Sequence, residues 1–222
     1  SFTDSPNIGA IHSFSFHNYV TLFTTPELID MIIGSVALAI GSAVLATILG
    51  TTGAIGAFYS KKNVNGTMSV LNQIPVVNAD VVTGFSLCIL LVVVFGVSKN
   101  TYIPLIIGHT VLSAPFVYLA VVPKLKQMDP SLYEAALDLG ATPGYTLIHI
   151  IIPQIASGIV SGFVMAVTLS LDDYFVATYT KPATFDTIST YVVNATKGSQ
   201  TNIRTALWLS LIHISEPTRR TP

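Results

Sequence analysis

Charge is scarce in this sequence of 222 residues, because Lys, Arg, Asp and Glu together make up only 9% of it. An ordinary soluble domain carries roughly a quarter charged residues. Hydrophobic residues make up 51% of the chain, which predicts an integral membrane protein. The 10 Lys and Arg residues and the net charge of −1 leave no basic stripe, so we expect no nucleic-acid partner.

Cysteine and phosphate-binding motifs are also missing. The single cysteine, Cys88, lies in an apolar segment, and a small apolar filler is its simplest interpretation. The sequence contains no GxxxxGK[ST] motif, so the chain does not bind ATP through a phosphate loop. We expect no cofactor, no metal site and no catalytic residue in this chain.

The two ends of the sequence predict an interrupted membrane domain. The chain begins at Ser1 without an initiator Met, and an apolar run that starts at Ala206 is too short to span a bilayer. The final string "LSLIHISEPTRRTP" resembles the translated read-through of a sequencing adapter. We therefore expect residues 1–30 to be an external segment after a missing first helix, residues 31–208 to be the membrane domain, and residues 209–222 to be non-native.

Four apolar segments are long enough to span about 30 Å of hydrocarbon at a rise of about 1.5 Å per residue. They run from Met31 to Tyr59, Met68 to Val97, Tyr102 to Val122 and Ile155 to Tyr179. The first is rich in Gly and Ser, which favours close packing against other helices. The fold class expected from this pattern is an all-α polytopic membrane helix bundle.

Lys residues in the loops predict the orientation of the bundle. Residues 1–30 contain no Lys or Arg, whereas Lys61 and Lys62 follow the first span and Lys124 and Lys126 follow the third. This places residues 1–30 outside and both Lys-bearing loops in the cytoplasm. Three further basic residues would then lie outside, against the rule: Lys181, Lys197 and Arg204.

The cytoplasmic loop 124–154 contains the signals of a short helix of about ten residues. Asp129 is a typical N-cap, Pro130 suits the first helical position, and Gly140 is typical of the left-handed residue that ends a helix. The apolar residues predicted to share one face are Leu132, Ala135, Ala136 and Leu139. Thr142 and Pro143 then begin a second helix, which Pro153 interrupts.

The spacing in this loop resembles the EAA motif of binding-protein-dependent ABC importer permeases. Glu134-Ala135-Ala136 is followed after three residues by Gly140 and after nine more by Ile150, with Ile152 before Pro153 where the family usually has Leu. An ordinary amphipathic connector is the alternative interpretation. The resemblance implies a type I (MetI-like) bundle whose short helix docks on an ATP-binding subunit. The residues that it assigns to coupling are Glu134, Ala135, Ala136, Gly140 and Pro153.

Three carboxylates lie within the predicted spans: Asp80, Asp172 and Asp173. A charge at membrane depth costs about 2.5–3.5 kcal/mol even on the lenient insertion scale, so we expect these side chains to face the bundle interior or a water-filled cavity. Regular helices would place Asp80 about 18 Å and Asp172 about 26 Å from the inner boundary. Neighbours on a helix diverge by about 100°, so at most one of Asp172 and Asp173 faces a central path.

The roles of these acids stay open between contact with a cationic solute, pairing with a neighbouring helix and capping at the membrane interface. Tyr174 fits either an interfacial aromatic belt or an aromatic face for an alkylammonium. Pro75, five residues before Asp80, favours either an unwound site or a simple kink. In the third span, His109 and Pro115 are interpreted as packing residues.

The stretch from Glu134 to Thr180 is similar to the C-type permease subunits of spermidine/putrescine importers, in which an S-L/M-D-D string follows the EAA loop. The similarity extends from Ser1 to about Trp208 and implies a core of six spanning helices, with the first absent here and the sixth cut. It implies a polyamine route past Asp80, Asp172, Asp173 and Tyr174. It also implies a bacterial inner-membrane assembly, embedded in lipid, with a second permease subunit, two ATP-binding subunits and an external solute-binding protein.

Other functions remain open at this point. A permease of the same family could carry another small solute. A stand-alone transporter or channel is disfavoured by the docking loop. An intramembrane aspartyl protease is disfavoured because no Gly-x-Gly-Asp string is present, although Asp80 and Asp172 could form a dyad. Because ATP hydrolysis would belong to a partner subunit, we expect this chain to be a transport subunit and not an enzyme.

Overall fold

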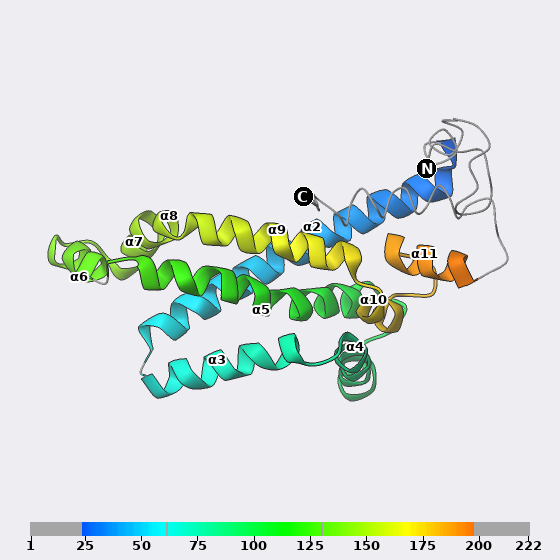
Figure 1. Cartoon of the computed structure of the whole chain (residues 1–222), viewed down its shortest axis with the longest axis horizontal. Coiled ribbons are helices and arrows are strands. Elements are labelled where there is room, and N and C mark those ends of the chain that lie inside the picture. Colours follow the sequence, from blue (N-terminus) through cyan, green and yellow to red (C-terminus); the bar gives the residue numbers. More distant parts are fainter. Residues whose placement is uncertain (1–23, 61, 130, 198–222) are drawn as a thin grey trace, which may run out of the picture.

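The computed structural model describes residues 24–60, 62–129 and 131–197 of the chain. These residues form helices and no strand (Figure 1). The helices are α2 (Pro26–Tyr59), α3 (Lys62–Val77), α4 (Asp80–Cys88), α5 (Ile103–Gln127), α6 (Ser131–Asp138), α7 (Pro143–Thr146), α8 (Ile152–Gln154), α9 (Ala156–Asp172), α10 (Phe175–Thr180) and α11 (Ile188–Lys197). Two π-helical segments join them, η1 (Ile89–Val94) and η2 (Leu147–Ile151). Lys61, Pro130, Arg204 and the expected non-native tail lie outside the described residues.

The core of the bundle lies between α2, α5 and α9, which pack side by side (Figure 1). Ala43 of α2, Val117 and Val121 of α5 and Ala166 of α9 are all buried there. Gly50 allows α2 and α5 to approach closely, because a Cβ at this position would lie 2.7 Å from the Val117 Cβ. The bundle is thus held by small residues of α2 and α9 against branched residues of α5.

The glycines of α2 serve this packing only in part. Gly34 faces the ring of Phe185, but Gly41, Gly53 and Gly56 have open space where a side chain would stand. The prediction of a helix packed through its small residues is therefore confirmed for one face of α2.

Two helices, α2 and α5, are long and apolar enough to cross a membrane by themselves. Two bent pairs bring the number of candidate spans in the described chain to as many as four. In the first pair, residues Gly66–Val77 and Asp80–Val94 meet at 103°. The depth estimated for Asp80 from a regular helix therefore does not apply, and Asp80 lies at the start of a new helix, after the kind of break that Pro75 left open. Pro75 lies inside α3 shortly before this break and removes one helical hydrogen bond there.

The fourth predicted span is also broken. Residues Pro143–Gln154 and Ala156–Asp172 meet at 70°, two residues after Pro153, as the sequence predicted an interruption there. The helix then ends again, because α9 stops at Asp172 and α10 starts at Phe175. The prediction of a continuous helix from Ile155 to Tyr179 is wrong, so the angle of about 100° does not apply at Asp173, although the two acids do differ in exposure.

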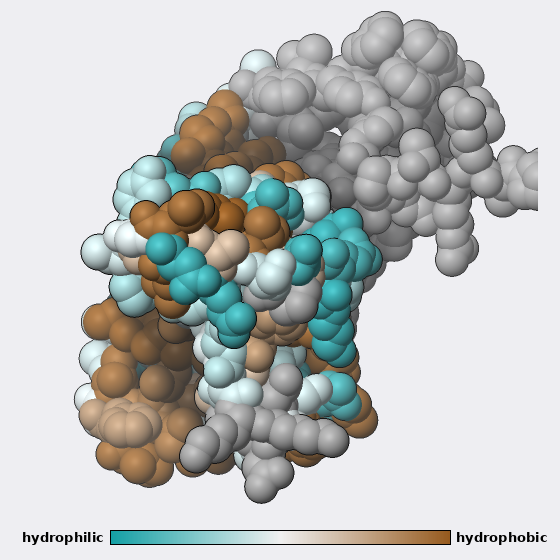
Figure 2. Space-filling model, turned by 90° about the vertical axis from the view of Figure 1, so that its left-hand side faces the viewer, coloured by the Kyte–Doolittle hydropathy of each residue, from teal (hydrophilic) through white to brown (hydrophobic). Residues whose placement is uncertain are grey.

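The two Lys-bearing loops lie at the same end of the bundle, where α2 ends, α3 starts and α6 is found (Figure 1). Figure 2 looks onto this end and shows hydrophilic residues gathered there, with hydrophobic residues along the sides. At the other end, Lys181 forms an ion pair with Asp186 at 2.6 Å. Its charge is therefore matched, which accommodates one of the basic residues that the orientation places outside.

Candidate functional site

A cavity of about 310 Å³ opens where the two broken spans meet. Its lining consists of Pro75, Val76, Asp80, Leu112, Phe116, Leu169, Asp172, Asp173, Tyr174 and Phe175. The structure thus brings together the four residues that the sequence predicted for a solute path, Asp80, Asp172, Asp173 and Tyr174. Asp80 lies more than 90 residues before the other three in sequence, and helix breaks bring it together with them.

The two breaks meet because α4 packs directly against α10. Asp80 is the first residue of α4, and Asp172 is the last residue of α9. Gly84 of α4 lies so close to α10 that a Cβ there would be 2.9 Å from the Val176 Cα. The start of α4 and the end of α9 therefore line the same cavity.

Asp173 is fixed by hydrogen bonds from the helix that follows it. Its Oδ1 accepts the Val176 N–H at 3.2 Å, and its Oδ2 accepts the Ala177 N–H at 2.7 Å. The Ser189 hydroxyl donates to the Asp173 backbone carbonyl. These contacts satisfy N–H groups that the start of α10 leaves without helical partners. Only 3% of the Asp173 side chain is exposed, so the carboxylate serves α10 more than the cavity.

Asp80 and Asp172 differ from Asp173 in that both are exposed. No Lys or Arg stands among the described residues that line the cavity, so its charge is negative. Phe116, Tyr174 and Phe175 add aromatic rings to the same lining. Carboxylates beside aromatic faces attract an organic cation, by charge and through the ring quadrupoles.

A polar group behind the cavity was not identified from the sequence. His109 is completely buried in α5 and packs as predicted, but its Nδ1 also lies 2.8 Å from the Ser170 Oγ. Its Nε2 lies 3.7 Å from Asp173 Oδ2. The signal available in the sequence was the polar ring itself, because a buried imidazole in an apolar span requires polar partners.

A second candidate site lies at the end of the bundle that carries the Lys-bearing loops, where α6 is capped as the sequence predicted. Asp129 Oδ1 accepts the Ser131 backbone N–H at 2.9 Å and the Ser131 hydroxyl at 2.7 Å. The hydroxyl and the N–H lower the pKa of the Asp129 carboxyl below its usual value, so the cap is ionised at neutral pH. Gly140 ends the segment with φ +86, in the left-handed region that the sequence predicted for it.

Much of the surface of α6 is exposed, including part of its apolar face. Ala136 is buried, but Ala135 and Leu139 are exposed, with 89% of Leu139 accessible. The apolar face that the sequence predicted for this helix is therefore only partly covered by the bundle. Glu134 is exposed as well, so a carboxylate and apolar side chains protrude together from the end of the bundle.

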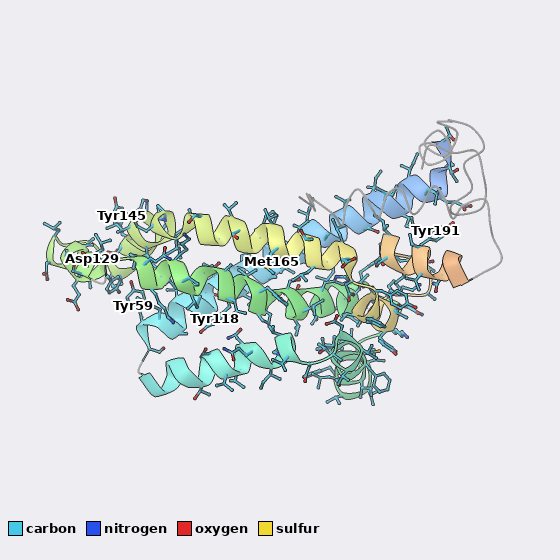
Figure 3. The ribbon with its side chains drawn as sticks, viewed as in Figure 1. Tyr59, Tyr118, Asp129, Tyr145, Met165 and Tyr191 are labelled. Atoms are coloured by element: carbon cyan, nitrogen blue, oxygen red, sulfur yellow. The ribbon has the colours of Figure 1, made fainter. Side chains whose placement is uncertain are left out.

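Aromatic contacts join α6 to the bundle. The rings of Tyr133 and Tyr59 lie 5.0 Å apart, which links α6 to the end of α2. Figure 3 shows Tyr59, Asp129 and Tyr145 at this end, far from Tyr191 at the other. Pro153 lies next to the bend of 70° that connects the loop to α9. Thus α6 contacts the end of α2 and is connected through the bend after Pro153 to α9, whose last residue lines the cavity.

Comparison with known proteins identifies the family. Residues 50–215 match the family described as "Binding-protein-dependent transport system inner membrane component". The chain is 32% identical over 206 residues to the spermidine/putrescine transport system permease protein PotC of Haemophilus influenzae, covering 91% of this chain and 78% of that protein. It is 30% identical over 185 residues to the putrescine transport system permease protein PotI of Escherichia coli, covering 81% of this chain and 66% of that protein.

Solved structures agree in fold. A chain of a bacterial alginate ABC transporter, crystallised with an alginate pentasaccharide-bound periplasmic protein, superposes with a TM-score of 0.70 at 19% identity, covering 91% of this chain and 79% of that one. A chain of an amino acid ABC transporter superposes with a TM-score of 0.58 at 17% identity, covering 92% and 95%. The match of three quarters of the sequence and the shared bundle lead to one conclusion: this chain belongs to the inner membrane components of binding-protein-dependent transport systems, the permease subunits of bacterial ABC importers.

Proposed function

We propose that the chain is a permease subunit of an ATP-driven polyamine importer. The observation that carries the proposal is the cavity in which Asp80, Asp172 and Asp173 meet without a basic residue in the described lining. A polyamine is a flexible chain of ammonium groups separated by methylenes. Separated carboxylates match such charges, and the aromatic and apolar lining matches the methylenes. The names of the relatives in Haemophilus influenzae and Escherichia coli support the same solute class.

The α6 end supplies the coupling in this proposal. Glu134, Ala135 and Ala136 lie on a short helix that protrudes from the bundle, and Gly140 and Pro153 provide the turn and the bend behind it. An ATP-binding subunit that closes against this helix would move α2 and α9 with it. The complete importer would contain two ATP-binding subunits, a second permease subunit and an external solute-binding protein.

Uptake by the assembled importer in proteoliposomes tests the proposal. With solute-binding protein and ATP present, we expect radiolabelled putrescine or spermidine to accumulate, and excess unlabelled polyamine to abolish the signal. Accumulation of an amino acid or sugar with no polyamine uptake would assign another solute to the same family. Uptake that continues without ATP would indicate a stand-alone transporter. Proteolysis blocked by an aspartyl transition-state analogue would indicate a protease.

A further inference from the structure

A buried line of polar side chains runs from α2 to the break between α9 and α10. The Ser42 Oγ lies 3.2 Å from the Ser170 Oγ, and the Ser170 Oγ lies 2.8 Å from His109 Nδ1. His109 Nε2 lies 3.7 Å from Asp173 Oδ2. Ser42, Ser170, His109 and Asp173 are all buried, so each of these contacts lies out of water and responds to small displacements.

The carboxylate at the end of the line determines the tautomer of the imidazole. A proton on Nδ1 would leave the Nε2 lone pair facing Asp173, which is electrostatically unfavourable. With the proton on Nε2, Ser170 donates to Nδ1 and the N–H is directed towards the carboxylate. Nε2 has no hydrogen-bond partner among the described residues, and the Asp173 carboxylate lies 3.7 Å from it.

Asp173 in turn sets the geometry of the break. Its two oxygens accept N–H groups of α10, and its backbone carbonyl accepts the Ser189 hydroxyl. Asp172, directly before it, is the exposed carboxylate of the pair and lines the cavity. Anything that holds Asp173 in place therefore also constrains the backbone from which the Asp172 side chain projects.

We propose that His109 is a positioning residue, which holds the Asp173 carboxylate at the start of α10 and thereby directs Asp172 into the cavity. For transport this inference rests on the proposed function, because Asp172 is a solute contact only if the cavity takes a cation. The inference that His109 holds the Asp173 carboxylate does not depend on which solute is carried. The imidazole acts through Asp173 and does not itself line the cavity.

Two substitutions test the contacts of the two imidazole nitrogens separately. His109→Asn places an amide near Nδ1, where it keeps the contact with Ser170 and loses the one with Asp173. His109→Gln places its amide near Nε2, where it keeps the contact with Asp173. Both variants remove the ring and introduce a neutral amide, so each controls for the other. If His109 had only a structural role, Asn and Gln would each lower the melting temperature. Any change in labelling or uptake would then follow that loss of stability.

The main measurement is the accessibility of position 172 in the full chain, with Asp172→Cys introduced into a Cys88→Ser background. The rate of labelling by a positively charged methanethiosulfonate measures how accessible the cysteine at position 172 is from the cavity. We expect His109→Gln to leave this rate within about twofold and His109→Asn to lower it about tenfold, the size of one charge-assisted contact. In an Asp173→Asn background the difference between the two should vanish.

Polyamine uptake with the native Asp172 is the second measurement. His109→Gln should retain uptake and His109→Asn should lose about tenfold, with equal amounts of protein in the membrane. Equal labelling rates for Asn and Gln, or a difference that persists with Asp173→Asn, would overturn the inference. A labelling difference without polyamine uptake by the unmodified importer would support the positioning role and refute the proposed solute. The two failures are therefore distinguishable.

Discussion

At the scale of single residues, the adjacent acids Asp172 and Asp173 have different environments. Asp173 accepts two backbone N–H groups and is buried, whereas Asp172 ends α9 and is exposed to the cavity. Adjacency in the sequence was enough to predict that the two differ. It could not identify which one faces the cavity, because neither Pro nor Gly marks the break after Asp172.

Separate substitutions of the two acids should affect different properties. Asp172→Asn removes an exposed charge, so we expect polyamine uptake to fall about tenfold with little change in melting temperature. Asp173→Asn leaves one acceptor oxygen and no charge at the start of α10, and we expect it to lower the free energy of unfolding by about 1–2 kcal/mol. Thermal unfolding in detergent and initial uptake rates measure the two effects. Identical stability losses in both variants would contradict this division.

At the scale of elements, α6 was predictable because its signals are local. Asp129 and Gly140 act on backbone groups within a few residues, so their types predict both ends of the helix. The breaks at residues 78–79 and 173–174 depend on distant partners, such as the packing of α4 on α10. Apolar runs predicted where the helices lie. The runs contain no information about where contacts between distant segments interrupt these helices.

The exposed carboxylates of α6 allow a matched test of coupling. Glu134 and Asp138 are both exposed and lie four residues apart on the same helix. We expect Glu134→Lys to insert normally but to lower the ratio of solute imported to ATP hydrolysed about tenfold, because the partner's donor then meets a like charge. Asp138→Lys makes the same change of charge and should retain most of the coupling. The ratio is measured in proteoliposomes that contain the assembled importer.

The result for Asp138→Lys is as informative as that for Glu134→Lys. Equal loss in both variants would indicate a general electrostatic effect at this end of the bundle. Normal coupled transport by Glu134→Lys would remove the assignment of this residue to the ATPase contact.

At the scale of the whole molecule, two sets of contacts have different roles. The core of α2, α5 and α9 holds the bundle together, while α4 and α10 meet beside it and bound the cavity. The predicted spans and the placement of both Lys-bearing loops at one end followed from hydropathy and charge. The cavity could not be predicted from hydropathy and charge, because it is formed by two bends of the chain. Only one of its acids lies near a proline.

The contact between α4 and α10 provides the last prediction. A methyl group at Gly84 would lie 2.9 Å from the Val176 Cα, and a backbone atom cannot move aside as a flexible side chain can. We therefore expect Gly84→Ala to cost about 1–3 kcal/mol of stability and to impair uptake, because α10 and the acids before it are displaced. Gly56→Ala is the matched control, since a methyl group there meets nothing within 4 Å and should stabilise α2 by up to about 1 kcal/mol. Thermal unfolding and the labelling rate of a cysteine at position 172 measure both variants. If Gly84→Ala matched Gly56→Ala in both measurements, α4 would not set the geometry of the cavity.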